Sequence, residues 1–270
     1  MQIAAVLGAP VSHSLSPVLH EAAYRELGHP DWKYSKIECP AADLPRIVKD
    51  APGCVRGFSV TMPGKEAALQ FADKVSKRAE LVGSANTLVR CKGGWYADCT
   101  DIDGAEAAIR ESGWTNGPVL LLGAGGTARP YLAALKNLNA TTVFVASRSR
   151  ERAEKTLQLA ATLGIDSEWV PLLEADVLSK YVERVGLLVS TLPADAAAAY
   201  ADVLQHVPRF VDVTYSPWPT TLAHSVASNG GVVVGGSVML LHQAVTQVEL
   251  FTGEKVSTSV FRAMELALPN

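Results

Sequence analysis

Residues 119–138 constrain the fold of this chain more than any other segment. They read VLLLGAGGTARPYLAALKNL: an apolar run, then a glycine-rich turn, then a helical pattern. A short apolar run that passes through a tight turn directly into a helix is typical of parallel α/β sheets. The segment therefore predicts an α/β fold.

The same alternation continues along the chain and supports this fold class. A helix is expected in PVLHEAAYRELG, with Ser16 as its N-cap, Pro17 at its first position and Gly28 beyond its end. Two strands, TLVRC and WYADCT, are expected to be joined by a turn at Gly93 and Gly94. Further strands are expected in IAAVLG, KYSKIEC, RGFSVTM, TTVFVASR, GLLVSTLP, RFVDVTY and GGVVVGG. This pattern predicts parallel sheets that are covered by helices.

Length, charge and cysteine usage exclude several classes of function. A chain of 270 residues suits one large domain or two moderate ones. Its formal net charge of −3 offers no basic surface for nucleic acid, and no apolar run is long enough to cross a membrane. Because the N-terminus lacks a secretory signal and the four cysteines lack CxxC spacing, we expect a cytoplasmic protein with reduced thiols. The six histidines lack metal-ligand spacing, so no metal site is expected.

The turn in residues 119–138 matches the dinucleotide fingerprint G-x-G-x-x-A through Gly123, Gly125 and Ala128. The first glycine permits the tight turn, the second lets the backbone approach a pyrophosphate, and the small third residue lets helix and strand pack closely. The N-terminus of the following helix would present free N–H groups to the phosphates. A glycine-rich turn can also simply join a strand to a helix, but the flanking strand and helix favour nucleotide binding.

The end of the next strand indicates which nucleotide is bound. NAD sites usually carry an acidic residue there, which holds the ribose 2′-hydroxyl. This chain instead has Ser147, Arg148 and Ser149, followed by Arg150 and Arg152. A guanidinium suits a 2′-phosphate because it can form paired, charge-assisted hydrogen bonds. We therefore predict NADP as the cofactor and Arg148 as its contact, and we interpret Arg150 as a solvated residue of the helix start.

Four polar residues of the first half lie where predicted strands stop: Thr61, Lys65, Asn86 and Asp101. Parallel α/β sheets build their sites at these strand ends. A lysine and an aspartate brought together could handle a proton while a nicotinamide handles a hydride. Taken singly, each residue also has an ordinary interpretation as a surface cation, strand residue, turn residue or helix cap.

Seven ordered segments resemble the shikimate dehydrogenase family: LGAPVSHSLSPVLH, GFSVTMPGK, GSANTL, DCTDIDG, LLGAGGTARPYLAAL, DVTYSPWPT and GGSVMLLHQAVTQVELFTG. The resemblance implies NADPH-dependent reduction of 3-dehydroshikimate to shikimate in aromatic amino-acid biosynthesis. It also implies two α/β domains with the active-site cleft between them. The substrate domain would comprise residues 1–102 and C-terminal helices in residues 236–270, and a Rossmann-type NADP domain would comprise residues 103–235.

The resemblance also assigns roles to residues. It implies that Lys65 and Asp101 form the catalytic pair and that Ser14 and Ser16 bind the substrate carboxylate. Further substrate contacts would be Thr61, Asn86, Gln243 and Tyr215. The cofactor side would comprise Gly123, Ala124, Gly125, Gly126, Thr127, Ala128, Ser147, Arg148, Ser149, Arg152, Val213 and Gly236.

The chain departs from the family pattern at several positions. Ser59, Cys99 and Ser147 stand where the family usually has asparagine, and the segment STLPAD at residues 190–195 replaces a common cofactor segment. Two other functions stay open: a quinate or dual quinate/shikimate dehydrogenase, and a non-catalytic NADP-sensing protein. Arg148 argues against a quinate dehydrogenase. The paired Lys65 and Asp101 argue against a non-catalytic NADP sensor. The expected partners are small molecules only, and the protein could be a monomer or a homodimer.

Overall fold

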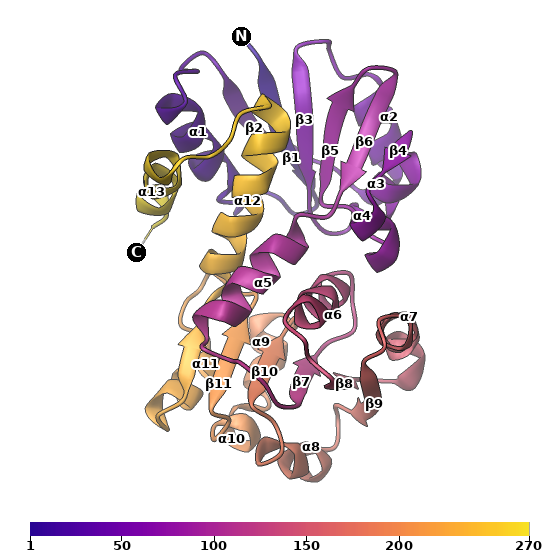
Figure 1. Cartoon of the computed structure of the whole chain (residues 1–270), viewed down its shortest axis with the longest axis vertical. Coiled ribbons are helices and arrows are strands. Elements are labelled where there is room, and N and C mark those ends of the chain that lie inside the picture. The colour runs from indigo at the N-terminus through magenta and orange to yellow at the C-terminus, as the bar shows by residue number, and fades with distance from the viewer. Residues whose placement is uncertain (270) are drawn as a thin grey trace. The chain divides into compact units, whose positions relative to one another are not determined.

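The computed structural model describes residues 1–269, apart from the side chain of Ala175, and the chain divides into two units (Figure 1). The first unit comprises Met1–Asp101 and the segment that begins at Leu240. The second unit comprises Ile102–Met239. Each unit contains a six-stranded sheet, so the predicted α/β class is confirmed.

The first unit is built on a mixed sheet with the strand order β2-β1-β3-β5-β6-β4. The strands β1, β2 and β3 are parallel, whereas β5 runs antiparallel to both β3 and β6. The predicted hairpin at Gly93 and Gly94 is confirmed. The strands are β1 (Ile3–Gly8), β2 (Lys33–Glu38), β3 (Val55–Val60), β4 (Lys74–Val75), β5 (Thr87–Cys91) and β6 (Gly94–Asp98). The helices of residues 1–101 are α1 (Ser16–Glu26), the 3-10 turn η1 (Ala41–Asp43), α2 (Leu44–Lys49), α3 (Lys65–Phe71) and α4 (Lys77–Val82).

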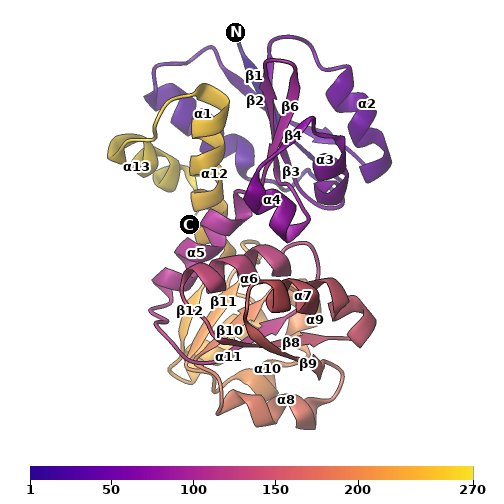
Figure 2. The ribbon, with the colours of Figure 1, turned by 45° about the vertical axis from the view of Figure 1, so that its right-hand side comes forward.

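Two C-terminal helices complete the first unit, as Figures 1 and 2 show beside α1. They are α12 (Gly236–Thr252), whose first turn lies in the second unit, and α13 (Thr258–Ala267). Leu19 of α1 packs in one apolar cluster with Val248 of α12 and Met264 of α13. Burial of these side chains from water is the main favourable contribution to this packing. The chain therefore returns to its first sheet after the second unit is complete.

The prediction that Ser16 caps α1 is wrong. The helix begins at Ser16, its N-cap position is Leu15, and no side chain caps it. The hydroxyl of Ser14 instead accepts a hydrogen bond from the Ser16 backbone N–H at 3.3 Å and donates to the Ser16 hydroxyl at 3.2 Å. The two hydroxyls thus face each other at the start of the helix.

The second unit is built on a wholly parallel sheet with the strand order β12-β11-β10-β7-β8-β9. Counted from β7, this is the 3-2-1-4-5-6 order of dinucleotide-binding folds. The strands are β7 (Val119–Leu122), β8 (Thr142–Ser147), β9 (Asp166–Pro171), β10 (Leu187–Ser190), β11 (Arg209–Asp212) and β12 (Val232–Val234). The helices are α5 (Asp101–Glu111), whose first residue belongs to the first unit, α6 (Ala128–Asn137), α7 (Arg150–Thr162), α8 (Ala175–Val182), α9 (Ala194–Ala198), α10 (Ala201–Leu204) and α11 (Thr221–Ser228).

Both faces of the second sheet are covered. All four residues of β7 are fully buried, and Leu120 and Leu122 pack in one cluster with Leu178 of α8 and Leu222 of α11. Leu121 points to the opposite face because side chains alternate along a strand, and it is buried there as well. Helices on both faces explain why the strands read as continuous apolar runs.

Two observations concern residues 1–269 as a whole. No helix in this range combines the length and apolar character that crossing a bilayer requires. No group of three or more His, Cys, Asp or Glu side chains in the same range is arranged to hold a metal ion.

Candidate active site

Lys65 and Asp101 meet in the first unit. Lys65 is the first residue of α3 and Asp101 is the first residue of α5, so both follow the end of a strand. The Lys65 Nζ donates to the Asp101 Oδ2 at 2.5 Å, and the two side chains are only 16% and 7% exposed. Charge-assisted hydrogen bonds are short and strong, and solvent screens this pair less than it screens an exposed ion pair. The structure thus brings together the ammonium and the carboxylate that the sequence pattern proposes for proton transfer.

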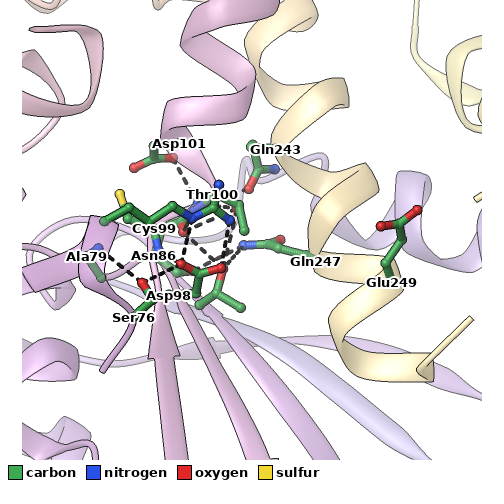
Figure 3. A network of polar contacts seen from close by, with 12 residues as sticks. Ser76, Ala79, Asn86, Asp98, Cys99, Thr100, Asp101, Gln243, Gln247 and Glu249 are labelled. Carbon is green, nitrogen blue, oxygen red and sulfur yellow. Dashed lines mark hydrogen bonds and ion pairs between the residues drawn. The ribbon is translucent and has the colours of Figure 1, made fainter. Parts of the chain in front are cut away.

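Asn86 links this pair to α12. Its Nδ2 donates to the Asp101 Oδ1 at 2.9 Å and to the Gln243 Oε1 at 3.2 Å (Figure 3). The orientation of the amide is fixed, because the Thr100 backbone N–H can only donate and it points to the Asn86 Oδ1 at 2.7 Å. Lys65, Asn86, Asp101 and Gln243 therefore form one connected cluster.

A second ion pair holds the loop that carries Asp101. Asp98, at the end of β6, accepts two hydrogen bonds from Arg78, at 2.6 and 2.7 Å, and one from Ser76 at 2.6 Å (Figure 3). Although burial raises the pKa of Asp98, these bonds and the Arg78 charge outweigh it and leave the pKa below its usual value. The neighbouring Cys99 is buried, and burial raises the pKa of its thiol to about 12. The family's asparagine is thus replaced by a neutral thiol inside a rigidly held loop.

The candidate carboxylate site lies between β1 and α1. Ser14 and Ser16 are 8% and 5% exposed, and neither hydroxyl is used as a helix cap. Thr61 follows β3 directly, and its backbone N–H donates to the Leu7 carbonyl of β1 at 2.8 Å. The Thr61 side chain leans against Gly8, where a Cβ would come within 2.3 Å of the threonine methyl. Gly8 is therefore required by the close approach of the two strand ends.

The glycine turn of the second unit follows β7, which is the first strand of this sheet along the chain and lies between β10 and β8. Gly123 has φ +95°, a backbone conformation that favours glycine, and a Cβ there would meet the Thr191 hydroxyl at 2.4 Å. At Gly125 and Gly126, by contrast, a Cβ would have no described atom within 4 Å. The backbone of this turn is open to a ligand just before α6, so the turn fits the pyrophosphate of a dinucleotide.

The turn after β8 holds the other candidate cofactor residues. The Ser147 hydroxyl donates to the Ser149 carbonyl at 2.7 Å and accepts from the Trp169 Nε1 at 3.0 Å. The Ser149 hydroxyl accepts from the Arg152 backbone N–H and caps α7. The two serine hydroxyls thus shape the turn, while Arg148 and Arg152 are exposed. The exposed guanidinium of Arg148 suits a 2′-phosphate.

The remaining candidates lie beyond β11 in the second unit. The Gly236 backbone N–H donates to the Thr214 carbonyl at 2.9 Å, and a Cβ at Gly236 would meet the Val213 carbonyl at 2.1 Å. Val213 and Gly236 are therefore adjacent. Tyr215 lies in the same turn, where burial raises the pKa of its hydroxyl. Tyr215 lies in the second unit, whereas all the other substrate candidates lie in the first unit.

Our reading of the sequence missed the side chains that surround Asn86. Gln247 is 1% exposed, and its Nε2 donates to the Asn86 carbonyl at 3.1 Å. The signal was available, because Gln247 follows Gln243 by four residues, and that spacing places both amides on one face of a helix. Ser59 is likewise buried and bonds to Gln247.

Comparisons with known proteins agree on one family. Residues 6–88 match the shikimate dehydrogenase substrate binding domain, and residues 236–263 match the shikimate 5'-dehydrogenase C-terminal domain. The shikimate dehydrogenase (NADP(+)) of Roseobacter denitrificans is 35% identical over 265 residues, which cover 94% of this chain and 93% of that protein. The crystal structure of Mycobacterium tuberculosis shikimate dehydrogenase aligns with a TM-score of 0.89 at 47% identity and covers 99% of this chain and 98% of that one. A shikimate 5-dehydrogenase from Thermus thermophilus, crystallised with NADP(H) and shikimate, has a TM-score of 0.81 at 33% identity, with 99% and 100% covered.

Proposed function

Because the chain belongs to the shikimate dehydrogenase family, we propose that it catalyses the reversible NADPH-dependent reduction of 3-dehydroshikimate to shikimate. This reaction is a step of aromatic amino-acid biosynthesis. The observation that carries the proposal is the buried contact between Lys65 and Asp101 beside Asn86. A protein that only senses NADP has no need of this pair.

The proposed chemistry centres on the Lys65 Nζ. When bound, the cofactor would supply the hydride acceptor, as NADP+, or the hydride donor, as NADPH, for the reacting carbon of the substrate. In reduction, the Lys65 Nζ protonates the developing alkoxide or stabilises its charge, and in oxidation it takes the hydroxyl proton. Asp101 orients the ammonium through its Oδ2, while its Oδ1 is held by Asn86. Two hydrogen bonds from different elements thus fix the carboxylate before any substrate arrives.

The other candidate residues are proposed to bind different parts of the substrate and of the cofactor. Ser14 and Ser16 offer two buried hydroxyls at a helix start for the substrate carboxylate. Thr61, Asn86, Gln243 and Tyr215 are the proposed partners of the substrate's remaining oxygens. The glycine turn receives the pyrophosphate, Arg148 receives the 2′-phosphate, and Arg152, Val213 and Gly236 complete the cofactor side.

Cysteine usage and net charge favour a particular compartment and class of partner. The four cysteines are free thiols, which favours the reducing cytoplasm as the compartment. The formal net charge of −3 favours small-molecule partners over nucleic acid. Both a monomer and a homodimer fit the proposed reaction, because every proposed site residue belongs to one chain.

Four parallel assays test the function. The purified protein is incubated with NADP+ or NAD+, each with shikimate and with quinate, and formation of reduced cofactor is followed by absorbance. The proposal expects NADP+ with shikimate to give the highest kcat/KM. A higher kcat/KM for quinate would indicate that the protein is a quinate dehydrogenase of the same superfamily. Absence of turnover in all four assays would contradict the proposal.

A further inference from the structure

A buried glutamine beneath the site has no role in the mechanism above. The Gln247 side chain of α12 makes four hydrogen bonds, which is the full capacity of an amide. Its Nε2 donates to the Asn86 carbonyl at 3.1 Å and to the Thr87 Oγ1 at 3.0 Å. Its Oε1 contacts the Ser59 Oγ at 2.6 Å and the His20 Nε2 at 3.3 Å. Figure 3 shows the Gln247 side chain reaching from α12 towards the Asn86 cluster.

The orientation of this amide is determined by its partners. The Asn86 carbonyl can only accept, so the Gln247 Nε2 must face it. The Oε1 therefore faces Ser59 and His20, and both of them must donate to it. This makes His20 the tautomer with hydrogen on Nε2, and its Nδ1 then accepts from the Tyr24 hydroxyl at 3.2 Å. Burial lowers the pKa of His20 to about 3, in keeping with a neutral ring.

Gln247 supports the orientation of Asn86 through Thr87, in addition to the hydrogen bond that Asn86 accepts from the Thr100 backbone. Because the Thr87 Oγ1 accepts from Gln247, its own hydrogen is free to donate to the Asn86 Oδ1, which lies at 2.9 Å. The Thr87 hydroxyl and the Thr100 backbone N–H thus hold the Asn86 Oδ1 together, and the Asn86 Nδ2 is directed at the Asp101 Oδ1. Gln247 also holds the backbone of the same residue. Gln247 therefore holds the Asn86 main chain directly and supports the Asn86 amide through Thr87.

The contacts of the Gln247 Oε1 give a role to Ser59, which stands where the family usually has asparagine. The Ser59 hydroxyl accepts from the Tyr34 hydroxyl at 2.6 Å and donates to Gln247. The Tyr34 ring stacks on His20 with centroids 4.1 Å apart. The Ser59 hydroxyl hydrogen is therefore engaged inside the protein, and Ser59 supports Gln247 instead of contacting a ligand.

We propose that Gln247 is a positioning residue for the Lys65–Asp101 pair, acting through Thr87 and Asn86. Ser59 and His20 in turn hold the Gln247 amide in its orientation. This inference rests on the proposed function, because its effect is a change in turnover. A positioning error of about 1 Å can cost as much as 100-fold in rate, so a residue without substrate contact can still control kcat.

The competing account is that Gln247 only stabilises the fold. Loss of a buried amide that makes four hydrogen bonds leaves several polar groups without partners, which destabilises any protein. The two accounts differ in their dependence on Asn86. A positioning role requires the Asn86 side chain, whereas a role in stability alone does not.

The deciding experiment compares Gln247→Met in two backgrounds. In the wild-type background, kcat for shikimate oxidation should fall roughly 10-fold or more, on the scale of positioning errors, while the Kd of NADP+ stays unchanged. In the Asn86→Ala background, the same substitution should change kcat by less than about 2-fold, because effects through one shared partner are not additive. Val248→Ala is the matched control: it is the adjacent buried residue of α12, it lies in the apolar cluster with Leu19, and its kcat should stay near wild type.

A second variant keeps the test decisive if Gln247→Met does not fold. Thr87→Val preserves the shape of a β-branched strand residue but removes the hydroxyl between Gln247 and Asn86, so kcat should fall several-fold at an unchanged NADP+ Kd. An equal loss of kcat in both backgrounds, or full activity in either variant, would overturn the positioning role. A wild-type protein that does not oxidise shikimate would instead refute the proposed function, so the two failures are distinguishable.

Discussion

The substrate side and the cofactor side of this chain are built in different ways. In the first unit, buried side chains hold one another: Asn86 bonds to Asp101, Asp101 to Lys65, and Gln247 to the Asn86 carbonyl. In the second unit, the candidate site consists of an open backbone turn at Gly125 and the exposed Arg148. The difference indicates that the candidate substrate side is organised before ligands arrive, whereas a cofactor bound at the second unit would itself supply partners for the open turn and for Arg148.

This difference predicts where substitutions will act. Groups that are already positioned and contact the reacting atoms contribute to the transition state, so their loss lowers kcat. Groups that hold remote parts of a ligand contribute to binding, so their loss raises Kd or KM. Substitutions at Lys65 and Asp101 should therefore lower kcat most, whereas substitutions at Arg148 and Ser14 should mainly weaken binding.

Replacement of Lys65 should have the largest effect. Lys65→Ala should reduce kcat by roughly 100-fold or more, the scale of general acid–base catalysis, with much smaller changes in shikimate and NADP+ affinity measured by titration. Asp101→Ala should be nearly as damaging and should also weaken substrate binding. The double variant should lose less than the product of the two single losses, because the groups act as a unit. If the Lys65→Ala variant keeps its turnover but loses affinity for the substrate, Lys65 acts in substrate binding and not in catalysis.

Acid should destabilise the protein through its first unit. Burial lowers the pKa of His20 to about 3 from the 6.5 of an unfolded chain. The unfolded state therefore binds the proton first, and the free energy of unfolding falls as the pH drops from about 6.5 towards 3. At pH 5 this contribution amounts to about 2 kcal/mol, from about 1.4 kcal/mol per pH unit. In urea titrations at pH 7 and pH 5, His20→Gln should lose about 2 kcal/mol less than wild type. Equal losses would show that His20 is not the acid-sensitive group.

The cofactor side should respond in affinity and selectivity. Arg148→Ala should weaken NADPH binding by about 1–3 kcal/mol, the range for a lost charge-assisted hydrogen bond, and should leave NAD binding almost unchanged. Isothermal titration with both cofactors measures the difference directly. An equal loss for both cofactors would be incompatible with a 2′-phosphate contact.

The smallest effect is expected at the carboxylate site. Ser14→Ala should raise the KM for shikimate roughly 10-fold at an unchanged cofactor affinity, which corresponds to about 1.5 kcal/mol, the low end for a hydrogen bond to a charged group. Ser16→Ala should behave in the same way and, because Ser16 does not cap α1, without the added stability cost of a lost cap. Shikimate affinity equal to wild type in Ser14→Ala would remove this loop from the substrate site.

The sequence predicted the features that local patterns encode. The glycine turn and its flanking elements were readable because backbone requirements at Gly123 select the residue type directly. The edge strand β9, DSEWVP, was not predicted, because its exposed edge position gives it no continuous apolar run. The cap at Ser16 was predicted wrongly because serine before proline is a common helix start, while here Ser14 and Ser16 bond to each other.

The substrate side illustrates the limit of local patterns. Lys65 and Asp101 are 36 residues apart, and Asn86 and Gln243 are 157 apart, so spacing alone could not bring them together. Resemblance to a family supplied their roles. Gln247 and Thr87 were missed, and Ser59 was recognised only as a departure from the family pattern. Their importance comes from mutual hydrogen bonds in three dimensions, and no motif of neighbouring residues encodes these bonds.

The division of labour between the two sides is tested most directly by the double variant Lys65→Ala with Arg148→Ala. The measurement is kcat/KM for NADP+ at saturating shikimate, in wild type, both single variants and the double variant. Because the two residues do separate tasks, their losses should multiply, so the free energies should add within about 0.5 kcal/mol. Marked non-additivity, with the double variant no worse than Lys65→Ala alone, would contradict the account and show that Arg148 acts in the same step as Lys65.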